Sequence, residues 1–391
     1  MNLILRTATL ALLLSQLGCR TSSPMSTASG IRHFYLGTYS TQLGHVDGKA
    51  KGISYWSIDL ESGGLSKEAG PWPIVNASHL CTSLDGRNLY AISETSEYEG
   101  KEDGYLTSYG VDPKNGHLES LGSISSQGVG PAYVALDQSG RFLLLANYVA
   151  GNVVVYPRGK KGRLQPPSAN IQHSGSSINP DRQEGPHPHS IITSPENDFV
   201  LVADLGLDKI KVYGFDEETG ELTPQSDRDV SVPAGSGPRH LAFHPSGHYV
   251  YLTLEMSSQV AAYRYNQGQL TLVDLYSTLP PTFSGSSSNA ELRITSNGRF
   301  LYASNRGHDS IAAFTINADS GELTFVHTIS TQGKTPRNFA IVPGDKLLVA
   351  GNQDSHSILS FHIDQESGRL TSTGKKAATP SPVLFHFDSR H

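Results

Sequence analysis

An all-β fold, a seven-bladed β-propeller, is predicted by two features of this chain: a phrase that repeats along it and a composition rich in turn-forming residues. The phrase consists of an apolar strand, a Pro/Asp/Asn-Gly turn, a second strand, a polar loop, a third strand and an acidic turn that ends in Gly-x-Leu. Its clearest copy spans residues 291–323. A period of roughly 50 residues, with room for four short strands, is typical of propeller blades.

Seven copies of the phrase follow one another. Aligned by the residue just past the second strand, they are anchored at Tyr39, Glu94, Asn147, Asp204, Glu255, Asn305 and Asn352. The first copy begins with the strand 33–37 and lacks an inner strand, whereas the apolar segment 382–387 follows the last copy. We therefore predict that this C-terminal segment inserts as the inner strand of the first blade and closes the ring.

The composition agrees with this architecture and excludes one class of partner. The chain has 39 Gly, 22 Pro and 17 Tyr and only 17% charged residues, which fits short strands joined by tight turns. No helical period of useful length appears after about residue 20. The net charge of −6 argues against nucleic acid as a partner. We expect one propeller domain over residues 32–391, acting as a monomer.

The N-terminus differs from the rest of the chain. Residues 1–19 combine a basic start, an apolar run over 7–17 and Gly18-Cys19, which is the plan of a secretory signal peptide and is too short to span a bilayer. The segment also resembles a bacterial lipoprotein box, although Gln16 stands where that motif usually has Leu. The Ser- and Thr-rich segment 20–31 reads as a flexible tether. We expect an exported protein, periplasmic or anchored in a bacterial envelope through a lipidated Cys19.

The antiparallel order of the strands predicts where functional residues gather. The connection into the innermost strand and the loop after the second strand emerge on the same face, so their residues meet at one mouth of the central channel. His189, Arg239 and Arg337 open inner strands, and the second strands are followed by polar residues: Glu94, Asn147, Asp204, Glu255, Asn305, Arg306, Asn352 and Gln353. Polar loop residues are often only solvated or capping. These positions nevertheless differ between copies whose other positions agree, which favours a functional site.

Four motifs then resemble those of a known family, in the same order. They are Gly185-Pro-His-Pro-His-Ser190, Gly237-Pro-Arg-His-Leu-Ala-Phe-His-Pro245, Tyr251-Leu-Thr-Leu-Glu255 and Tyr302-Ala-Ser-Asn-Arg-Gly-His-Asp-Ser-Ile311. The chain resembles the seven-bladed propeller lactonase family, which holds bacterial propeller-type 6-phosphogluconolactonases and fungal carboxy-muconate lactonizing enzymes. The likeness extends over about residues 33–387.

The resemblance implies a set of site residues at the mouth chosen from strand geometry. The family's histidine, two arginines and glutamate fall on the expected catalytic residues His189, Arg239, Arg306 and Glu255. A further family glutamate, before an inner strand, matches Glu291. With the other polar residues of the rim, the expected substrate-binding set is His187, Asp204, Glu291, Asn305 and Arg337.

These residue types suit the opening of a lactone, which needs a base for water, a cationic group for the oxyanion and an acid for the leaving alkoxide. Glu255 is the expected base. Arg239 and Arg306 are expected to hold the oxyanion and an anionic group of the substrate. His189 is expected to transfer a proton or to orient the ring oxygen.

A metal site is not expected. His187 and His189 have a spacing that could place two ligands on one strand face, but no third ligand is visible and Pro186 and Pro188 make the segment a rigid turn. Calcium-dependent propeller gluconolactonases have six blades and other ligands, so no cofactor is expected.

The expected partner is a small-molecule lactone, and the expected reaction is hydrolysis of a sugar-acid lactone resembling 6-phosphogluconolactone. Two alternatives remain open from the sequence: a non-catalytic binding propeller of the cell envelope, and a muconate-type cycloisomerase, which would also use two arginines.

Overall fold

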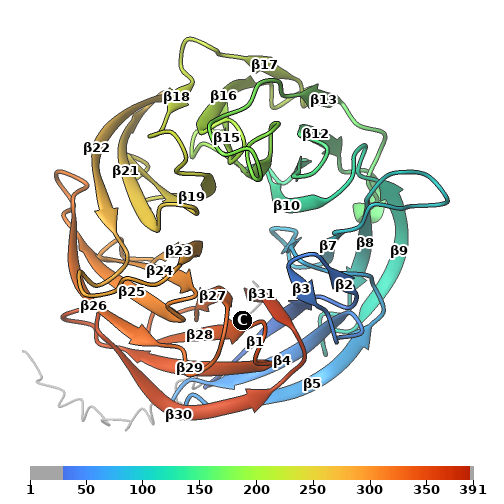
Figure 1. Ribbon diagram of the computed structural model, residues 1–391. Helices are drawn as coiled ribbons and strands as arrows, with labels where there is room; N and C mark the ends of the chain where they lie inside the picture. Colours follow the sequence, from blue (N-terminus) through green and yellow to red (C-terminus); the bar gives the residue numbers. More distant parts are fainter. Residues whose placement is uncertain (1–29, 388–391) are drawn as a thin grey trace, which may run out of the picture. The chain divides into compact units, whose positions relative to one another are not determined.

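The computed structural model describes residues 30–387, and it forms the predicted propeller of seven four-stranded antiparallel sheets around a central channel (Figure 1). From the channel outwards, blade 1 contains β31 (Pro382–Phe387), β1 (Ile31–Thr38), β4 (Ile53–Asp59) and β5 (Leu65–Trp72). Blade 2 contains β6 (Leu80–Thr82), β7 (Asn88–Ser93), β8 (Tyr105–Val111) and β9 (Leu118–Ser125). Blade 3 contains β10 (Pro131–Leu136), β11 (Phe142–Asn147), β12 (Asn152–Pro157) and β13 (Ala169–Gln172).

The remaining four blades follow the same order. Blade 4 contains β14 (Pro188–Thr193), β15 (Phe199–Asp204), β16 (Lys209–Phe215) and β17 (Leu222–Pro224), and β18 (Val230–Ser231) also pairs with β16. Blade 5 contains β19 (Pro238–Phe243), β20 (Tyr249–Leu254), β21 (Gln259–Asn266) and β22 (Gln269–Ser277). Blade 6 contains β23 (Ser288–Ile294), β24 (Phe300–Arg306), β25 (Ser310–Ile316) and β26 (Leu323–Ser330). Blade 7 contains β27 (Pro336–Ile341), β28 (Leu347–Asn352), β29 (Ser357–Ile363) and β30 (Leu370–Ala378).

Two short elements lie outside these sheets. The hairpin of β2 (Gln42–Leu43) and β3 (Val46–Asp47) stands in the loop between β1 and β4, and a single 3₁₀ turn, η1, covers Lys160–Gly162. Within residues 30–387, no helix is long and apolar enough to cross a membrane. The predicted signal peptide with Cys19 lies outside the described residues, as does all but the end of the predicted tether.

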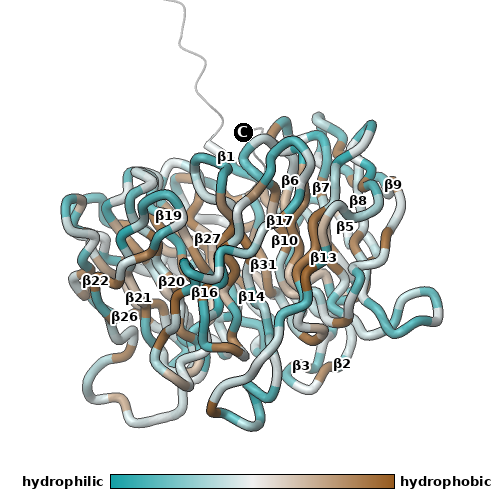
Figure 2. Tube along the Cα trace, turned by 90° about the horizontal axis from the view of Figure 1, so that it is seen from above, coloured by the Kyte–Doolittle hydropathy of each residue, from teal (hydrophilic) through white to brown (hydrophobic). Residues whose placement is uncertain are grey.

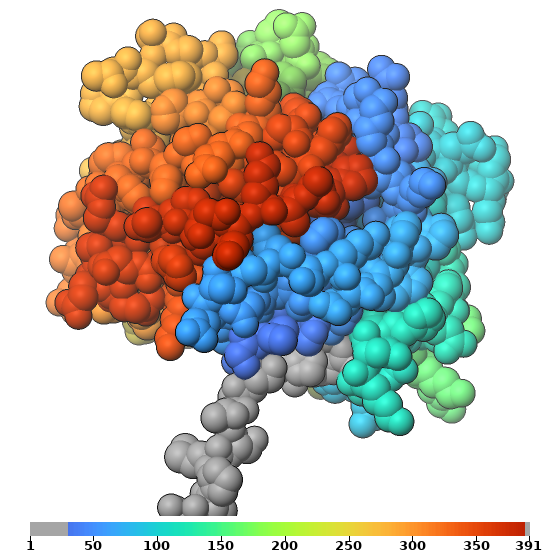
Figure 3. Space-filling model, turned by 90° about the horizontal axis from the view of Figure 1, so that it is seen from below, coloured from blue at the N-terminus to red at the C-terminus, as the bar shows by residue number. Residues whose placement is uncertain are grey.

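The predicted ring closure is confirmed. Strand β31 pairs antiparallel with β1, from Phe34 opposite Phe387 to Thr38 opposite Pro382. Figure 3 shows the red C-terminal blade against the blue first blade. The apolar side chains of Val383, Leu384 and Phe385 on β31 are at most 3% exposed, so closure also buries a hydrophobic strand.

A tyrosine and a glycine explain part of the repeated phrase. In four blades a tyrosine on the second strand donates a hydrogen bond from its hydroxyl to a backbone carbonyl in the next blade. The acceptor is the glycine of the turn between the third and fourth strands, or the equivalent glycine, and each bond is 2.9 Å long. The pairs are Tyr35 with Gly116, Tyr90 with Gly162, Tyr251 with Gly321 and Tyr302 with Gly368. These glycines have φ between 69° and 82°, a conformation that residues with a Cβ rarely adopt. The phrase therefore specifies contacts between blades as well as turns within them.

Apolar residues concentrate along the strands, and hydrophilic residues are more frequent in the loops, some of which also contain apolar stretches (Figure 2). The hydrophobic clusters lie between neighbouring sheets: one joins Tyr249 and Tyr251 of blade 5 to Leu292 and Phe314 of blade 6. Since each blade buries its faces against its neighbours, the strand ends at the channel mouth are left for polar side chains.

Candidate active site

In most blades the inner strand presents a displaced residue to the channel. In five blades the pairing of the inner strand with its neighbour shifts register immediately after a proline. The residues that follow these prolines all line a chamber in the channel: Val383, Ala132, His189, Arg239 and Arg337. A β-bulge re-aims a side chain that the ladder would otherwise hold in the sheet. The proline and bulge together thus position three of the predicted site residues, His189, Arg239 and Arg337.

The ends of the second strands contain two successive positions that the sequence alignment merged. Asn147, Asp204, Asn305 and Asn352 are fully buried, and each is the last residue of the second strand that pairs with the third strand of its blade. The three asparagine amides donate to carbonyls of the loop from the preceding blade, those of Ser126, Thr278 and Thr331. These residues tie blades together, and none lines the cavity described below.

The next position along the chain carries the functional side chains. In six blades the backbone N–H at this position donates a hydrogen bond to a carbonyl in the connection that leads into the inner strand. The six residues are Tyr39, Glu94, Tyr148, Leu205, Glu255 and Gln353. In blade 6 the residue at this position is Arg306, which pairs with Ser288. The alignment predicted from the sequence is therefore wrong by one residue in blades 3, 4, 6 and 7. The correct register places Tyr148 and Arg306 beside Glu255 and Glu94.

A cavity of about 330 Å³ opens at this mouth. Its lining consists of His45, Glu94, Ala132, Tyr148, Val149, Arg182, His189, Glu255, Arg306 and Arg337. Three guanidinium groups thus face two carboxylates, and a fourth, from Arg239, contacts Glu255 beside the cavity. The excess of positive charge suits an anionic ligand or a developing oxyanion.

Glu255 is enclosed by arginines. Its Oε2 lies 2.9 Å from Arg239 Nε and 2.9 Å from Arg306 Nη2, and its Oε1 accepts a hydrogen bond of 2.9 Å from Arg182 Nη2. Burial alone would raise the pKa of this carboxyl. The positive charges of Arg306 and Arg239 outweigh burial and hold its pKa well below the ordinary value. Glu255 is therefore a fixed anion that keeps three cations together.

Replacing Glu255 by glutamine is expected to destabilise the protein, because Arg239 and Arg306 are then left buried without their carboxylate. Removing one partner of a buried ion pair typically costs about 3–5 kcal/mol. Arg182, whose side chain is 43% exposed, can turn to solvent. Thermal unfolding should give a lower Tm for Glu255→Gln, partly restored by added phosphate. The control is Glu94→Gln: within residues 30–387 the Glu94 carboxylate forms no ion pair, and it accepts a bond from the Tyr39 hydroxyl that an amide oxygen can also accept. An unchanged Tm in Glu255→Gln would contradict this role.

His189 faces the cavity as a neutral imidazole. It is 6% exposed and packs edge-on against Tyr148 and His240, with ring centroids 5.2 and 5.3 Å away. Burial lowers its pKa well below 6.5, and the positive charge of Arg239 lowers it further. Its Nδ1 has no hydrogen-bond partner within residues 30–387. A neutral imidazole with an unoccupied nitrogen can accept a proton.

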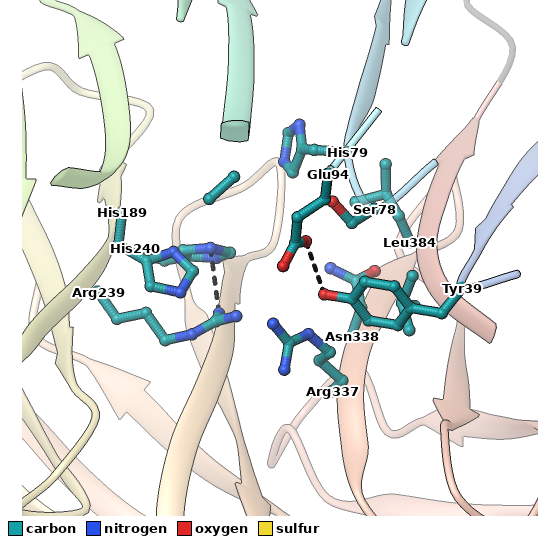
Figure 4. Close-up of a pocket in the computed structure, with 12 residues that line it drawn as sticks. Tyr39, Ser78, His79, Glu94, His189, Arg239, His240, Arg337, Asn338 and Leu384 are labelled. Atoms are coloured by element: carbon teal, nitrogen blue, oxygen red, sulfur yellow. Dashed lines mark hydrogen bonds between the residues drawn. The ribbon is translucent and has the colours of Figure 1, made fainter. Parts of the chain in front are cut away.

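Glu291 lies behind the wall of the site. Arg239 Nη1 donates to His240 Nε2 at 3.0 Å, and His240 Nδ1 in turn lies 3.2 Å from Glu291 Oε1 (Figure 4 shows the first contact). The Glu291 carboxylate also accepts bonds from the Leu292 backbone and from Asn338. It lines neither the cavity nor the chamber below it. Glu291 therefore orients His240 and, through it, Arg239.

The other predicted substrate-binding residues are also occupied by the scaffold. His187 stacks on Tyr148 at 4.6 Å, and its nitrogens lie 2.8 Å from the Tyr148 carbonyl and 3.1 Å from Glu184. Asp204 pairs with His173 at 2.6 Å. Asn305 accepts from Thr278 and Asn289. Only Arg337 of that set lines the cavity. Over residues 30–387, no group of three or more His, Cys, Asp or Glu side chains is arranged to hold a metal ion.

Sequence reasoning missed several residues of the site. His240 follows Arg239 within the same bulge, and Tyr148 follows Asn147 in the corrected register, so both could have been found from the repeat. Arg182 and His45 could not. They stand in the loop between β13 and β14 and in the β2–β3 hairpin, whose residues fall outside the repeated pattern.

Comparison with known proteins agrees with this geometry. Residues 33–387 match the family described as "Lactonase, 7-bladed beta-propeller". The chain belongs to this family. Membership makes the protein a lactonase-type hydrolase, and the match covers all seven blades.

Relatives of this lactonase support the assignment. It is 35% identical to the 6-phosphogluconolactonase of Bacillus subtilis over 79% of this chain and 84% of that protein. A solved structure titled as the periplasmic gluconolactonase of Pseudomonas aeruginosa is 32% identical, with a TM-score of 0.86 over 92% of this chain and 99% of the other. A putative 6-phosphogluconolactonase from Bacteroides fragilis is 31% identical, with a TM-score of 0.84 over 93% and 99%.

Proposed function

We propose that this lactonase hydrolyses a sugar-acid lactone resembling 6-phosphogluconolactone to its open acid, in the cavity at the channel mouth. The observation that carries the proposal is the meeting of a neutral, buried His189 with guanidinium groups held in place by one carboxylate. A base and preorganised cations for an oxyanion are what opening a lactone requires.

In the proposed reaction, His189 takes a proton from water as the water oxygen bonds to the lactone carbonyl carbon. Arg306 and Arg239 stabilise the oxyanion that forms. The bond between the carbonyl carbon and the ring oxygen then breaks, and the imidazolium of His189 returns the proton to the alkoxide. The acid product loses its proton to solvent, so atoms and charge balance.

This division of roles differs from the expectation that Glu255 is the base. A carboxylate between three guanidinium groups has little tendency to accept a proton. We assign Glu255 the positioning of Arg239 and Arg306, whose fork geometry suits oxyanions and carboxylates.

Arg337 is the proposed binding residue for an anionic group of the substrate. Its guanidinium lies over the Tyr39 ring, 5.4 Å from the centroid, and lines the cavity. Arg182, Arg239 and Arg306 each form an ion pair with Glu255. Arg337, in contrast, forms no ion pair within residues 30–387. A phosphate or carboxylate of the substrate would complete its contacts.

The pH dependence of kcat/KM provides a test of the base. Because the pKa of His189 lies well below 6.5, the imidazole stays neutral as the pH falls through that value. We expect kcat/KM to be flat from about pH 8 to below pH 6.5 and to fall only in more acidic solution, as the base becomes protonated. Initial rates are corrected for spontaneous lactone opening. An acid limb centred at or above pH 6.5 would contradict this assignment.

The substrate is tested by comparing gluconolactone with its 6-phosphate, with and without a chelator. We expect acceleration of both above the spontaneous rate, and a lower KM for the phosphorylated lactone. Arg337→Gln should raise KM for the phosphorylated lactone and leave that for the plain lactone nearly unchanged. A folded protein that accelerates neither reaction would instead support a non-catalytic binding propeller.

We also propose that the protein is exported and acts as a monomer in the periplasm or at the envelope. Support comes from the residue pattern of 1–19 and from the Pseudomonas structural neighbour, which is titled as periplasmic. Cell fractionation, labelling of Cys19 with a radioactive fatty acid and size-exclusion chromatography test this. Recovery of the intact chain in the cytosol would contradict export.

A further inference from the structure

Beneath the open cavity, a smaller chamber of about 20 Å³ extends into the channel. The two spaces share the residues Glu94, Ala132, His189 and Arg337, so they adjoin. Figure 4 shows the side chains that surround the chamber, which come from several blades. Ser78 and His79, at the entrance to β6, line the chamber but not the outer cavity. Neither residue has a part in the reaction described above.

Three side chains of this chamber carry buried polar atoms without a hydrogen-bond partner within residues 30–387. They are Ser78 Oγ, His79 Nε2 and His189 Nδ1. Their residues are at most 9% exposed. A buried polar group left unpaired destabilises the folded protein, and native proteins satisfy nearly all such groups, often with ordered water. Three of them around one chamber point to a shared polar ligand.

The donor and acceptor pattern of the chamber fits water. His79 Nδ1 accepts the backbone N–H of Val134 at 3.4 Å, so in the neutral ring the proton stands on Nε2. Burial lowers the pKa of His79 well below 6.5, which keeps this ring neutral. His79 therefore offers a donor, Ser78 offers a hydroxyl that can donate or accept, and His189 Nδ1 offers an acceptor when its proton is on Nε2.

The volume of the chamber limits the size of the ligand that it can hold. A volume of 20 Å³ exceeds the roughly 10–15 Å³ that one water requires, and it is too small for a sugar or a phosphate. A water there would have two to three polar partners, as ordered buried waters do. Because the chamber adjoins the outer cavity, such a water would lie below a lactone bound there.

We infer that Ser78 and His79 hold a single water molecule in this chamber, and that this water is the nucleophile of the lactonase reaction. The inference rests on the proposed function. The water oxygen bonds to the lactone carbonyl carbon from beneath while its proton passes to His189 Nδ1. The ring C–O bond then breaks, and the same proton goes to the alkoxide oxygen. Ser78 and His79 are positioning residues that aim the water and fix its orientation.

A crystal structure of the full chain, at a resolution that reveals ordered solvent, tests the binding site. We expect density for one water within hydrogen-bond distance of Ser78 Oγ and His79 Nε2. In Ser78→Val, whose methyl groups would fill the chamber, this density should vanish. A wild-type chamber without ordered water would overturn the inference.

Kinetics of the same variants test the role of the water. Misplacing a reacting group by about 1 Å can cost on the order of 100-fold in rate. We expect Ser78→Val to lower kcat on gluconolactone by about that factor with little change in KM, and Ser78→Ala, which leaves room for the water, to lower it less. The matched control is Thr82→Val at the far end of β6, which removes a hydroxyl that contacts the His386 ring outside the chamber. It should keep kcat.

The outcomes separate this inference from the function on which it rests. An active wild-type enzyme whose Ser78→Val variant retains full kcat would overturn the nucleophile role and leave the lactonase assignment intact. A wild-type protein that opens no lactone would refute both. Equal losses of kcat in Ser78→Val and Thr82→Val would indicate damage to β6 and would also overturn the positioning role.

Discussion

Replacing His189 by glutamine is expected to lower kcat for lactone hydrolysis by about 10²–10⁴-fold, the range attributed to a single general acid–base group. Glutamine retains a polar side chain of similar reach but cannot take a proton at neutral pH. KM should change little, because Arg337 and Arg306, which are proposed to contact the substrate, are untouched. Initial rates on gluconolactone, together with the Tm of the variant, measure both effects.

His187→Gln is the matched control for that variant. His187 lies two residues earlier, at the same end of β14, but it stacks on Tyr148 and does not line the cavity. Its loss should cost less than tenfold, or about 1.4 kcal/mol. Equal losses in the two variants would contradict the assignment of His189, and retention of kcat in His189→Gln would pass the role of base to another group.

Removal of residues 380–391 is expected to unfold the protein. The deletion removes β31 from the first blade and exposes the inner edge of β1. Burial of Val383, Leu384 and Phe385 alone is worth roughly 4.5–9 kcal/mol at about 1.5–3 kcal/mol for each side chain. That amount is comparable with the entire stability of a typical domain, about 5–15 kcal/mol.

Circular dichroism and thermal unfolding of the truncated chain measure this loss. We expect no cooperative transition, or one at a much lower temperature, with aggregation through the exposed strand edge. A synthetic peptide of residues 380–391, added to the truncated chain, should restore part of the transition, which separates loss of the strand from a general effect of shortening. An unchanged Tm after truncation would show that the ring does not depend on β31.

The architecture could be predicted because the repeat records it several times. Each copy of the phrase marks the same turns, and the unpaired segment 382–387 had one natural place in the ring. The hydroxyl of Tyr251 could not be assigned in the same way, because its acceptor, Gly321, is 70 residues away in the next blade. Contacts between blades depend on the three-dimensional stacking of units and leave little trace in the pattern of a single unit.

The site could be located but not fully resolved. His189, Glu255, Arg306 and Arg337 line the cavity, and Arg239 lines the chamber below it. Strand order alone brings such residues to one mouth. The sequence does not reveal which polar groups already form hydrogen bonds within the scaffold, and for this reason it also predicts buried scaffold residues such as Asp204 and Asn305 as site residues.

Two local causes explain the remaining differences. An asparagine at the last paired position of a second strand and a glutamate one position later cannot be told apart by the sequence pattern. The predicted alignment of the copies is therefore one residue out of register in four blades. Arg182 lies in an irregular loop of blade 4, where no repeat predicts its approach to Glu255. In blades 3, 4 and 7, the proline before the bulge pairs with the last ladder residue of the second strand, and this signal would have corrected the first error there.

Lactone hydrolysis with His189 as the base is tested by the rate of lactone opening, measured side by side for the wild-type protein and His189→Gln. The substrates are gluconolactone and its 6-phosphate, and the rates are corrected for spontaneous hydrolysis. We expect acceleration of both lactones by the wild type, with a lower KM for the phosphorylated one, and a loss of about 10²–10⁴-fold in kcat in a folded His189→Gln variant. A folded wild-type protein that accelerates neither lactone, or a variant as active as the wild type, would contradict this assignment.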